Sequence, residues 1–118
     1  MQVVDIHAAL AAQDCGTFIN LVRFNESDVG ACDISGISPV REMHPDTDEF
    51  FLSLEGYFEV SLLDGDEPST YTIGAGSTFV VPKGVWHKPA APDGCKFVYM
   101  TPGSSLHSDA ADPRLEIR

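Results

Sequence analysis

Apolar residues at the start of the chain recur at helical spacing. Within residues 3–12, Val3, Ile6 and Leu10 lie three or four positions apart among alanines, which predicts one short N-terminal helix. Two polar residues and a glycine within residues 13–16 are typical of a helix end.

Beyond this helix the pattern changes to that of an all-β domain. Short runs rich in β-branched and aromatic residues alternate with turn-forming residues at intervals of about 8–12 residues, as in antiparallel sheets. The β-rich runs are residues 17–24, 49–54, 57–63, 69–73, 77–81 and 96–101. The turn signals are Gly36, Gly56, Asp64-Gly65, Gly74, Gly76, Pro82, Gly84, Asp93-Gly94 and Pro102-Gly103. No long helical pattern separates the runs, so we expect a β-sandwich or barrel.

The chain length of 118 residues fits one globular domain. A chain of this size buries roughly two-thirds of the surface that it exposes when unfolded, so its core needs neither a disulfide nor a metal for stability. We expect the helix in residues 1–15, the barrel in residues 16–103 and a polar tail in residues 104–118, which wraps the surface or is partly disordered.

Composition limits the partners. The chain has 18 Asp and Glu against 7 Lys and Arg, and its net charge of −11 makes nucleic acid and anionic membranes poor partners. No apolar run approaches the roughly 20 residues of a membrane helix. The first residues lack the basic and apolar pattern of a secretion signal, so we expect no export. The cysteines, Cys15, Cys32 and Cys95, are odd in number and far apart, so we expect buried free thiols and a cytoplasmic protein.

Four side chains that can bind a metal ion occur at the ends of expected strands. Glu42 and His44 are two residues apart, so on an extended strand they project from the same face. A turn-prone stretch follows, and Glu49 opens the next apolar strand. His87 follows a Pro-Lys-Gly turn and begins a later strand. The sequence therefore predicts a cluster of two imidazoles and two carboxylates.

These residues lie in motifs that resemble those of the cupins. The first cupin motif runs Gly, five residues, His-x-His, three or four residues, Glu, six residues, Gly. Here the same spacing is filled by Gly36, Glu42, His44, Glu49 and Gly56. The one departure is Glu42, which stands where the family has its first histidine.

The second cupin motif runs Gly, five residues, Pro-x-Gly, two residues, His, three residues, Asn. Here it reads Gly76, Pro82, Gly84, His87 and Ala91, so that only the final Asn is missing. The resemblance covers about residues 36–91 and implies a double-stranded β-helix barrel of the jelly-roll type.

The resemblance also implies a divalent metal ion inside the barrel. The family holds it with two histidines and a glutamate of the first motif and the histidine of the second. His44, Glu49 and His87 retain two histidines and one carboxylate, a set that suits iron(II), manganese, nickel or zinc.

The departure at Glu42 leaves two roles open. As a fourth ligand, Glu42 would bring a second carboxylate to the site and neutralise a divalent ion fully, which favours harder ions and lowers the pKa of bound water less. If Glu42 does not bind the metal ion, it would be a candidate general base beside an open coordination position.

Strand alternation suggests further contacts. Phe51 and Ser53 share the face of Glu49, so both are candidate substrate contacts. Tyr99, on a late strand, is a third, because its hydroxyl could orient a polar group. The opposite face of residues 50–54 is also apolar, so a second sheet or another subunit must cover it, and we expect a homodimer.

The function implied by the resemblance is metal-dependent chemistry on a small organic molecule, of the oxygenase, isomerase or lyase type. The alternative is a non-catalytic cupin that binds or senses a small molecule. A third interpretation is a structural barrel without metal. The sequence leaves these three open.

Overall fold

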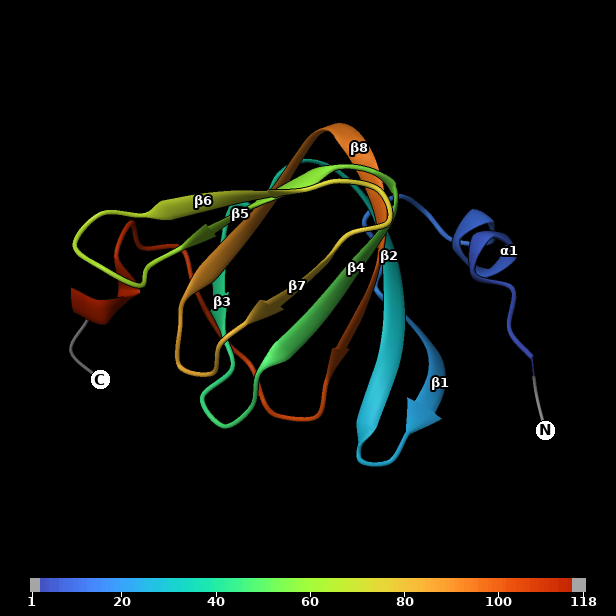
Figure 1. Cartoon of the computed structure of the whole chain (residues 1–118), viewed down its shortest axis with the longest axis horizontal. Coiled ribbons are helices and arrows are strands. Elements are labelled where there is room, and N and C mark those ends of the chain that lie inside the picture. The colour runs from blue at the N-terminus through green and yellow to red at the C-terminus, as the bar shows by residue number, and fades with distance from the viewer. Residues whose placement is uncertain (1–2, 116–118) are drawn as a thin grey trace.

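The computed structural model describes residues 3–115. Its elements, in chain order, are α1 (Ile6–Ala11), β1 (Ile19–Phe24), β2 (Ser27–Ile37), β3 (Arg41–Met43), β4 (Glu49–Gly56), β5 (Phe58–Leu62), β6 (Ser69–Ile73), β7 (Thr78–Val81), β8 (His87–Thr101), β9 (Leu106–Ser108) and a 3-10 turn, η1 (Pro113–Leu115). The described strands pair antiparallel and curl around a common interior (Figure 1). The predicted all-β barrel with a short N-terminal helix is confirmed.

The 15-residue strand β8 organises the sheet. On one edge it pairs first with β3, at His87, and then with β2 as far as Thr101. On the other edge it pairs first with β5 and then with β4. Both halves of the barrel therefore share β8, and the second-motif histidine lies at the end of β8 nearest β3.

The Asp93-Gly94 pair, predicted as a turn between strands, instead lies inside β8. Gly94 has a φ of +84°, and the registers of both β2 and β4 shift opposite this part of β8. A Cβ atom on Gly56 would collide with the carbonyl oxygen of Gly94, so only glycine allows the end of β4 to pass this close. The irregularity bends β8 and lets it change partners.

The core lies inside the curl. On β4, Glu49, Phe51 and Ser53 are buried while the intervening side chains are half-buried, which confirms the expected alternation. The interior apolar cluster consists of Cys32, Phe51, Phe58, Val60, Leu62, Ile73, Val81, Ala91, Cys95 and Phe97. Cys32 and Cys95 are buried free thiols as predicted, but Cys15 is exposed, because it precedes the sheet.

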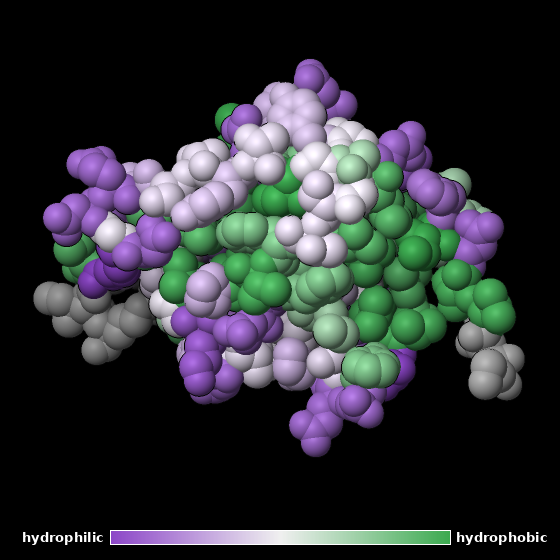
Figure 2. All heavy atoms as spheres, in the orientation of Figure 1, coloured by the Kyte–Doolittle hydropathy of each residue, from purple (hydrophilic) through white to green (hydrophobic). Residues whose placement is uncertain are grey.

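Helix α1 packs on the outside of the sheet. Asp5 caps it by accepting a hydrogen bond from the Ala8 N–H at 3.0 Å. Leu10 is buried against Ala31 and Val98, so α1 covers part of the outer apolar face. Figure 2 shows further apolar side chains across the middle of the viewed face and toward the N-terminal helix. The homodimer stays a prediction.

The segment expected as a polar tail contains an ordered strand. β9 pairs with β3, with Glu42 opposite His107. Further along, the Arg114 guanidinium donates to the carbonyl oxygens of Leu63 and Gly65, which anchors η1 to the barrel. Residues 116–118 of this tail lie outside the described residues. Between residues 3 and 115, no helix is long and apolar enough to cross a membrane.

Candidate metal centre

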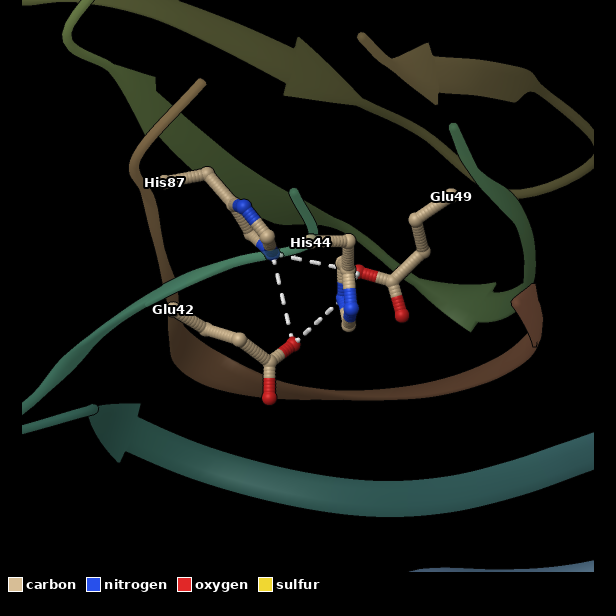
Figure 3. Close-up of side chains that lie close together, drawn as sticks. All are labelled: Glu42, His44, Glu49 and His87. Carbon is tan, nitrogen blue, oxygen red and sulfur yellow. Dashed lines mark hydrogen bonds and ion pairs between the residues drawn. The ribbon is translucent and has the colours of Figure 1, made fainter. Parts of the chain in front are cut away.

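Three strands bring four side chains from the two motifs together (Figure 3). Glu42 lies on β3 and His44 directly follows it, Glu49 begins β4, and His87 begins β8. Backbone pairing fixes their positions, because Glu42 is the register partner of His87. The Gly84 N–H also donates to the His44 carbonyl at 2.8 Å, which ties the turn of the second motif to the first.

The donor atoms converge on one point. Glu49 Oε1 lies 3.1 Å from Nε2 of His44 and 3.1 Å from Nε2 of His87. Glu42 Oε1 lies 3.0 Å and 3.5 Å from the same two nitrogens (Figure 3). One donor atom from each of the four residues lies within 4.8 Å of the others, so the group could hold a single metal ion.

The opposite nitrogens of both imidazoles are held by the backbone. His44 Nδ1 lies 3.2 Å from the Ser104 carbonyl oxygen, and His87 Nδ1 lies 3.4 Å from the Val85 carbonyl oxygen. A carbonyl oxygen only accepts, so each Nδ1 donates and each Nε2 faces the carboxylates. Histidines that bind metals in proteins are usually oriented in this way. The residues therefore fit a divalent ion.

The electrostatics also indicate a site for a cation. Burial lowers the pKa of His44 and of His87, but hydrogen bonds to Glu42 and Glu49 outweigh burial and raise these pKa values to about 10 and about 9. Burial raises the pKa of Glu42, but its hydrogen bonds to the two histidines hold this pKa well below its usual range. Two carboxylates thus favour positive charge here, which protons or a divalent ion can supply.

A third histidine, in the C-terminal segment after β8, contacts the cluster of four side chains. His107 on β9 lies opposite Glu42, and its Nε2 is 2.9 Å from Glu42 Oε2. The other oxygen of Glu42 faces His44 and His87, so His107 helps to fix the orientation of the carboxylate. The sequence carries no spacing signal for this contact, since it depends on where the tail folds back.

A cavity of about 300 Å³ adjoins the four residues. Its lining combines the candidate ligands with aromatic and small polar side chains: Phe18, Ser38, Val40, Glu42, His44, Glu49, Phe51, His87, Pro89, Phe97, Tyr99, Thr101, Ser105 and His107. Two of the predicted substrate contacts, Phe51 and Tyr99, lie in this wall.

The third predicted contact, Ser53, does not line the cavity. Its side chain points inward as expected but lies deeper in the core, where Oγ donates to the Gly56 carbonyl at 3.0 Å and lies 3.5 Å from Cys95 Sγ. Alternation along β4 correctly predicted the face of the sheet. It could not predict the depth, since Phe51 separates Ser53 from Glu49.

Glycine makes room for Tyr99. Gly30 on β2 is the register partner of Tyr99, and a Cβ atom at Gly30 would lie 2.5 Å from the ring. Burial raises the pKa of Tyr99 to about 12, so its hydroxyl remains protonated and able to donate near neutral pH.

Solved structures share this architecture. A cupin-2 domain containing protein from Shewanella frigidimarina NCIMB 400 is 28% identical, with a TM-score of 0.74, over 85% of this chain and 94% of that chain. Hydroquinone 1,2-dioxygenase from Sphingomonas sp. TTNP3, with 4-hydroxybenzoate bound, is 14% identical, with a TM-score of 0.70, over 84% of this chain and 78% of that chain. The hydroquinone 1,2-dioxygenase PnpCD, in complex with Cd2+ and 4-hydroxybenzonitrile, is 16% identical, with a TM-score of 0.71, over 82% of this chain and 70% of that chain.

The two dioxygenases are too distant in sequence to show more than a common fold. No curated protein sequence matches the chain. The cupin domain family, in contrast, matches residues 33–101, which include both motifs and all four candidate ligands. Since the match spans more than half of the chain, the protein belongs to the cupin domain family.

Proposed function

We propose that this cupin is a metal-dependent enzyme that acts on a small organic molecule. The observation that carries the proposal is the convergence of four donor atoms within 4.8 Å beside a cavity of about 300 Å³. A structural barrel needs no such arrangement, because its core is already supplied by the apolar cluster around Phe58 and Phe97.

The proposed ligands are His44, Glu49, His87 and, as the fourth, Glu42. The short distances from Glu42 Oε1 to both imidazoles support its inclusion. The mixed nitrogen and oxygen donors suit iron(II), manganese, nickel or zinc. When bound, such an ion would polarise an oxygen of the substrate or activate dioxygen.

The surrounding residues would then orient the substrate. Phe51 offers an apolar surface beside His87, with ring centroids 6.4 Å apart. Tyr99 offers a hydroxyl, and His107 holds Glu42 in place. The two solved hydroquinone dioxygenases show that this fold can carry oxygenase chemistry, and the proposed centre is equally compatible with isomerase or lyase chemistry.

Elemental analysis of the protein purified without a histidine tag tests the proposal. We expect about one equivalent of a divalent transition metal per chain, and oxygen uptake or turnover of a small organic substrate with that metal bound. A protein without stoichiometric metal, and unable to bind added manganese or zinc, would contradict the proposal. Metal and ligand binding without turnover of any substrate would instead favour a sensor or binding cupin.

We also propose a homodimer that forms through the outer apolar face. Val22 and Phe24 on the edge strand β1 are 44% and 60% exposed, which supports an additional interface there. Sedimentation equilibrium at micromolar concentration should give twice the mass of the chain, and a monomeric mass would contradict the dimer.

The three free thiols support a reducing, cytoplasmic location.

A further inference from the structure

We propose that the cavity selects a small, neutral molecule with one aromatic ring and rejects anions of the same size. This inference rests on the proposed metal centre, because the ring would lie beside it with an oxygen atom directed toward it. The arguments come from the shape of the wall, its charge and its volume.

Four rings form one continuous surface, here called the aromatic wall: Phe18, Phe51, Phe97 and Tyr99. The ring centroid of Phe97 lies 5.6 Å from that of Phe51 and 6.1 Å from that of Tyr99. Phe18 lies edge-on to Tyr99 at 5.5 Å. All four residues line the cavity. Aromatic pairs at such spacings stabilise a further ring placed against them.

Phe18 stands apart from the other three because it is 62% exposed. It comes from the segment before β1, and its ring contacts Phe97 and Tyr99 on β8. The side chain therefore lies at the rim of the cavity, in contact with the aromatic wall on one side and largely exposed.

The charge of the cavity opposes anions. Its lining contains no lysine or arginine, while two carboxylates, Glu42 and Glu49, are present. A divalent ion would only neutralise these two charges. Arg41, the nearest arginine along β3, points elsewhere and donates to the Ser61 carbonyl at 3.5 Å. His107 is already paired with Glu42. An anionic substrate would find no unpaired cationic partner among the lining residues.

The volume suits about one ring with its substituents. A cavity of about 150 Å³ is enough to bind benzene. The cavity of about 300 Å³ found here can hold such a ring with a few further atoms. Hydroxyl groups of Ser38, Tyr99 and Thr101 could bind polar substituents without adding charge.

The charge argument can be tested with two phenols of similar shape. Manganese is first titrated into the protein to establish that the metal centre binds. 4-Hydroxybenzamide, which is uncharged, and 4-hydroxybenzoate, which carries a carboxylate of the same shape, are then titrated into the manganese-loaded protein near neutral pH. We expect the amide to bind at least about tenfold more tightly. Equal or tighter binding of the carboxylate would overturn the inference, and failure to bind manganese would overturn the proposed function instead.

The ring argument has its own pair of probes. Phenol should bind the manganese-loaded protein several-fold more tightly than cyclohexanol, since both carry one hydroxyl but only phenol has an aromatic face. Phe18→Leu should weaken phenol binding about twofold to tenfold and leave manganese binding unchanged. Tyr71→Leu is the control, because Tyr71 on β6 is 43% exposed but does not line the cavity, and it should change neither.

The results separate a contact with the ligand from a general effect of the substitution. Equal affinity for phenol and cyclohexanol, or no effect of Phe18→Leu on phenol, would contradict an aromatic site. Equal losses in the Phe18 and Tyr71 variants would also contradict it, because they would reflect the surface of the barrel and not the cavity.

Discussion

The floor and the rim of the cavity are assembled in different ways. The floor consists of Glu42, His44, Glu49 and His87, which occur in two short motifs and are joined by the pairing of β3 with β8. The rim is completed by Phe18, from before β1, and by residues of the tail that follow β8. The binding groups of the floor are therefore encoded by local spacing, whereas the rim depends on distant segments that fold back over it.

Under the proposed function, the floor would carry the chemistry and the rim the selectivity. A cupin can retain the floor and alter the rim without disturbing its core, because Phe18 and His107 are largely exposed while His44, Glu49 and His87 are buried. Changes to the floor should therefore affect metal binding strongly. Changes to the rim should affect it weakly or not at all.

The largest effect is expected from His87→Ala, which removes a buried proposed ligand at the start of β8. We expect the variant to lose most of its metal while keeping its fold, because the apolar core stabilises the barrel. Elemental analysis measures the metal and circular dichroism the fold. His7→Ala, which removes an exposed imidazole on α1, is the control and should retain metal. Stoichiometric metal in the His87 variant would refute the assigned site.

A second prediction concerns pH. Because the folded-state pKa values of His44 and His87 are about 10 and about 9, both imidazoles of the metal-free protein are protonated near neutrality, and a metal ion must displace these protons. Affinity for manganese should therefore rise with pH between 6 and 8, by up to about hundredfold per unit if two protons leave. Calorimetry in buffers of different ionisation enthalpy measures the release. Binding without proton release would be inconsistent with the proposed ligands.

Glu42→Gln decides between the two roles of this carboxylate. If Glu42 is the fourth ligand, the loss of one negative charge should weaken manganese binding by about tenfold or more. An unbound general base would give the opposite pattern, with unchanged affinity and lost turnover, because an amide accepts no proton near neutral pH. Glu26→Gln, at an exposed turn, controls for the change in net charge. If affinity and turnover both stay unchanged, Glu42 has neither role.

The smallest effect is expected at His107, which touches the centre only through Glu42. His107→Ala should weaken manganese binding by about threefold to tenfold. This loss is small for a residue that orients a metal ligand, since such residues usually contribute about tenfold or more to metal affinity. His107→Gln should recover part of the loss, since its amide N–H can still donate to Glu42 Oε2. An effect as large as that of His87→Ala would mean that floor and rim are not distinct.

The sequence alone predicted the fold class and the residues of the floor, because strand alternation and motif spacing are local properties. It missed β2 as a strand, since Asp28, Gly30, Asp33 and Gly36 interrupt the apolar pattern. The glycine at position 30 is explained only by the ring of Tyr99 opposite it. Such a relation between two strands is not visible along one of them.

The rim was the part that sequence patterns could not predict. β9 is only three residues long, and His107 reaches Glu42 through strand pairing that no local signal announces. Likewise, Asp93-Gly94 has the composition of a turn but forms an irregularity inside β8, because neighbouring strands hold both of its flanks. In each case tertiary contacts decided the outcome.

Anomalous diffraction from crystals of the zinc-loaded protein tests the central claim most directly. The account predicts one strong zinc peak among Nε2 of His44, Nε2 of His87 and Oε1 of Glu49, with bonds of about 2.0–2.2 Å, and with Glu42 Oε1 as a further ligand. No peak among these atoms, or a zinc ion bound only elsewhere on the surface, would contradict the assignment of this cluster as the metal centre.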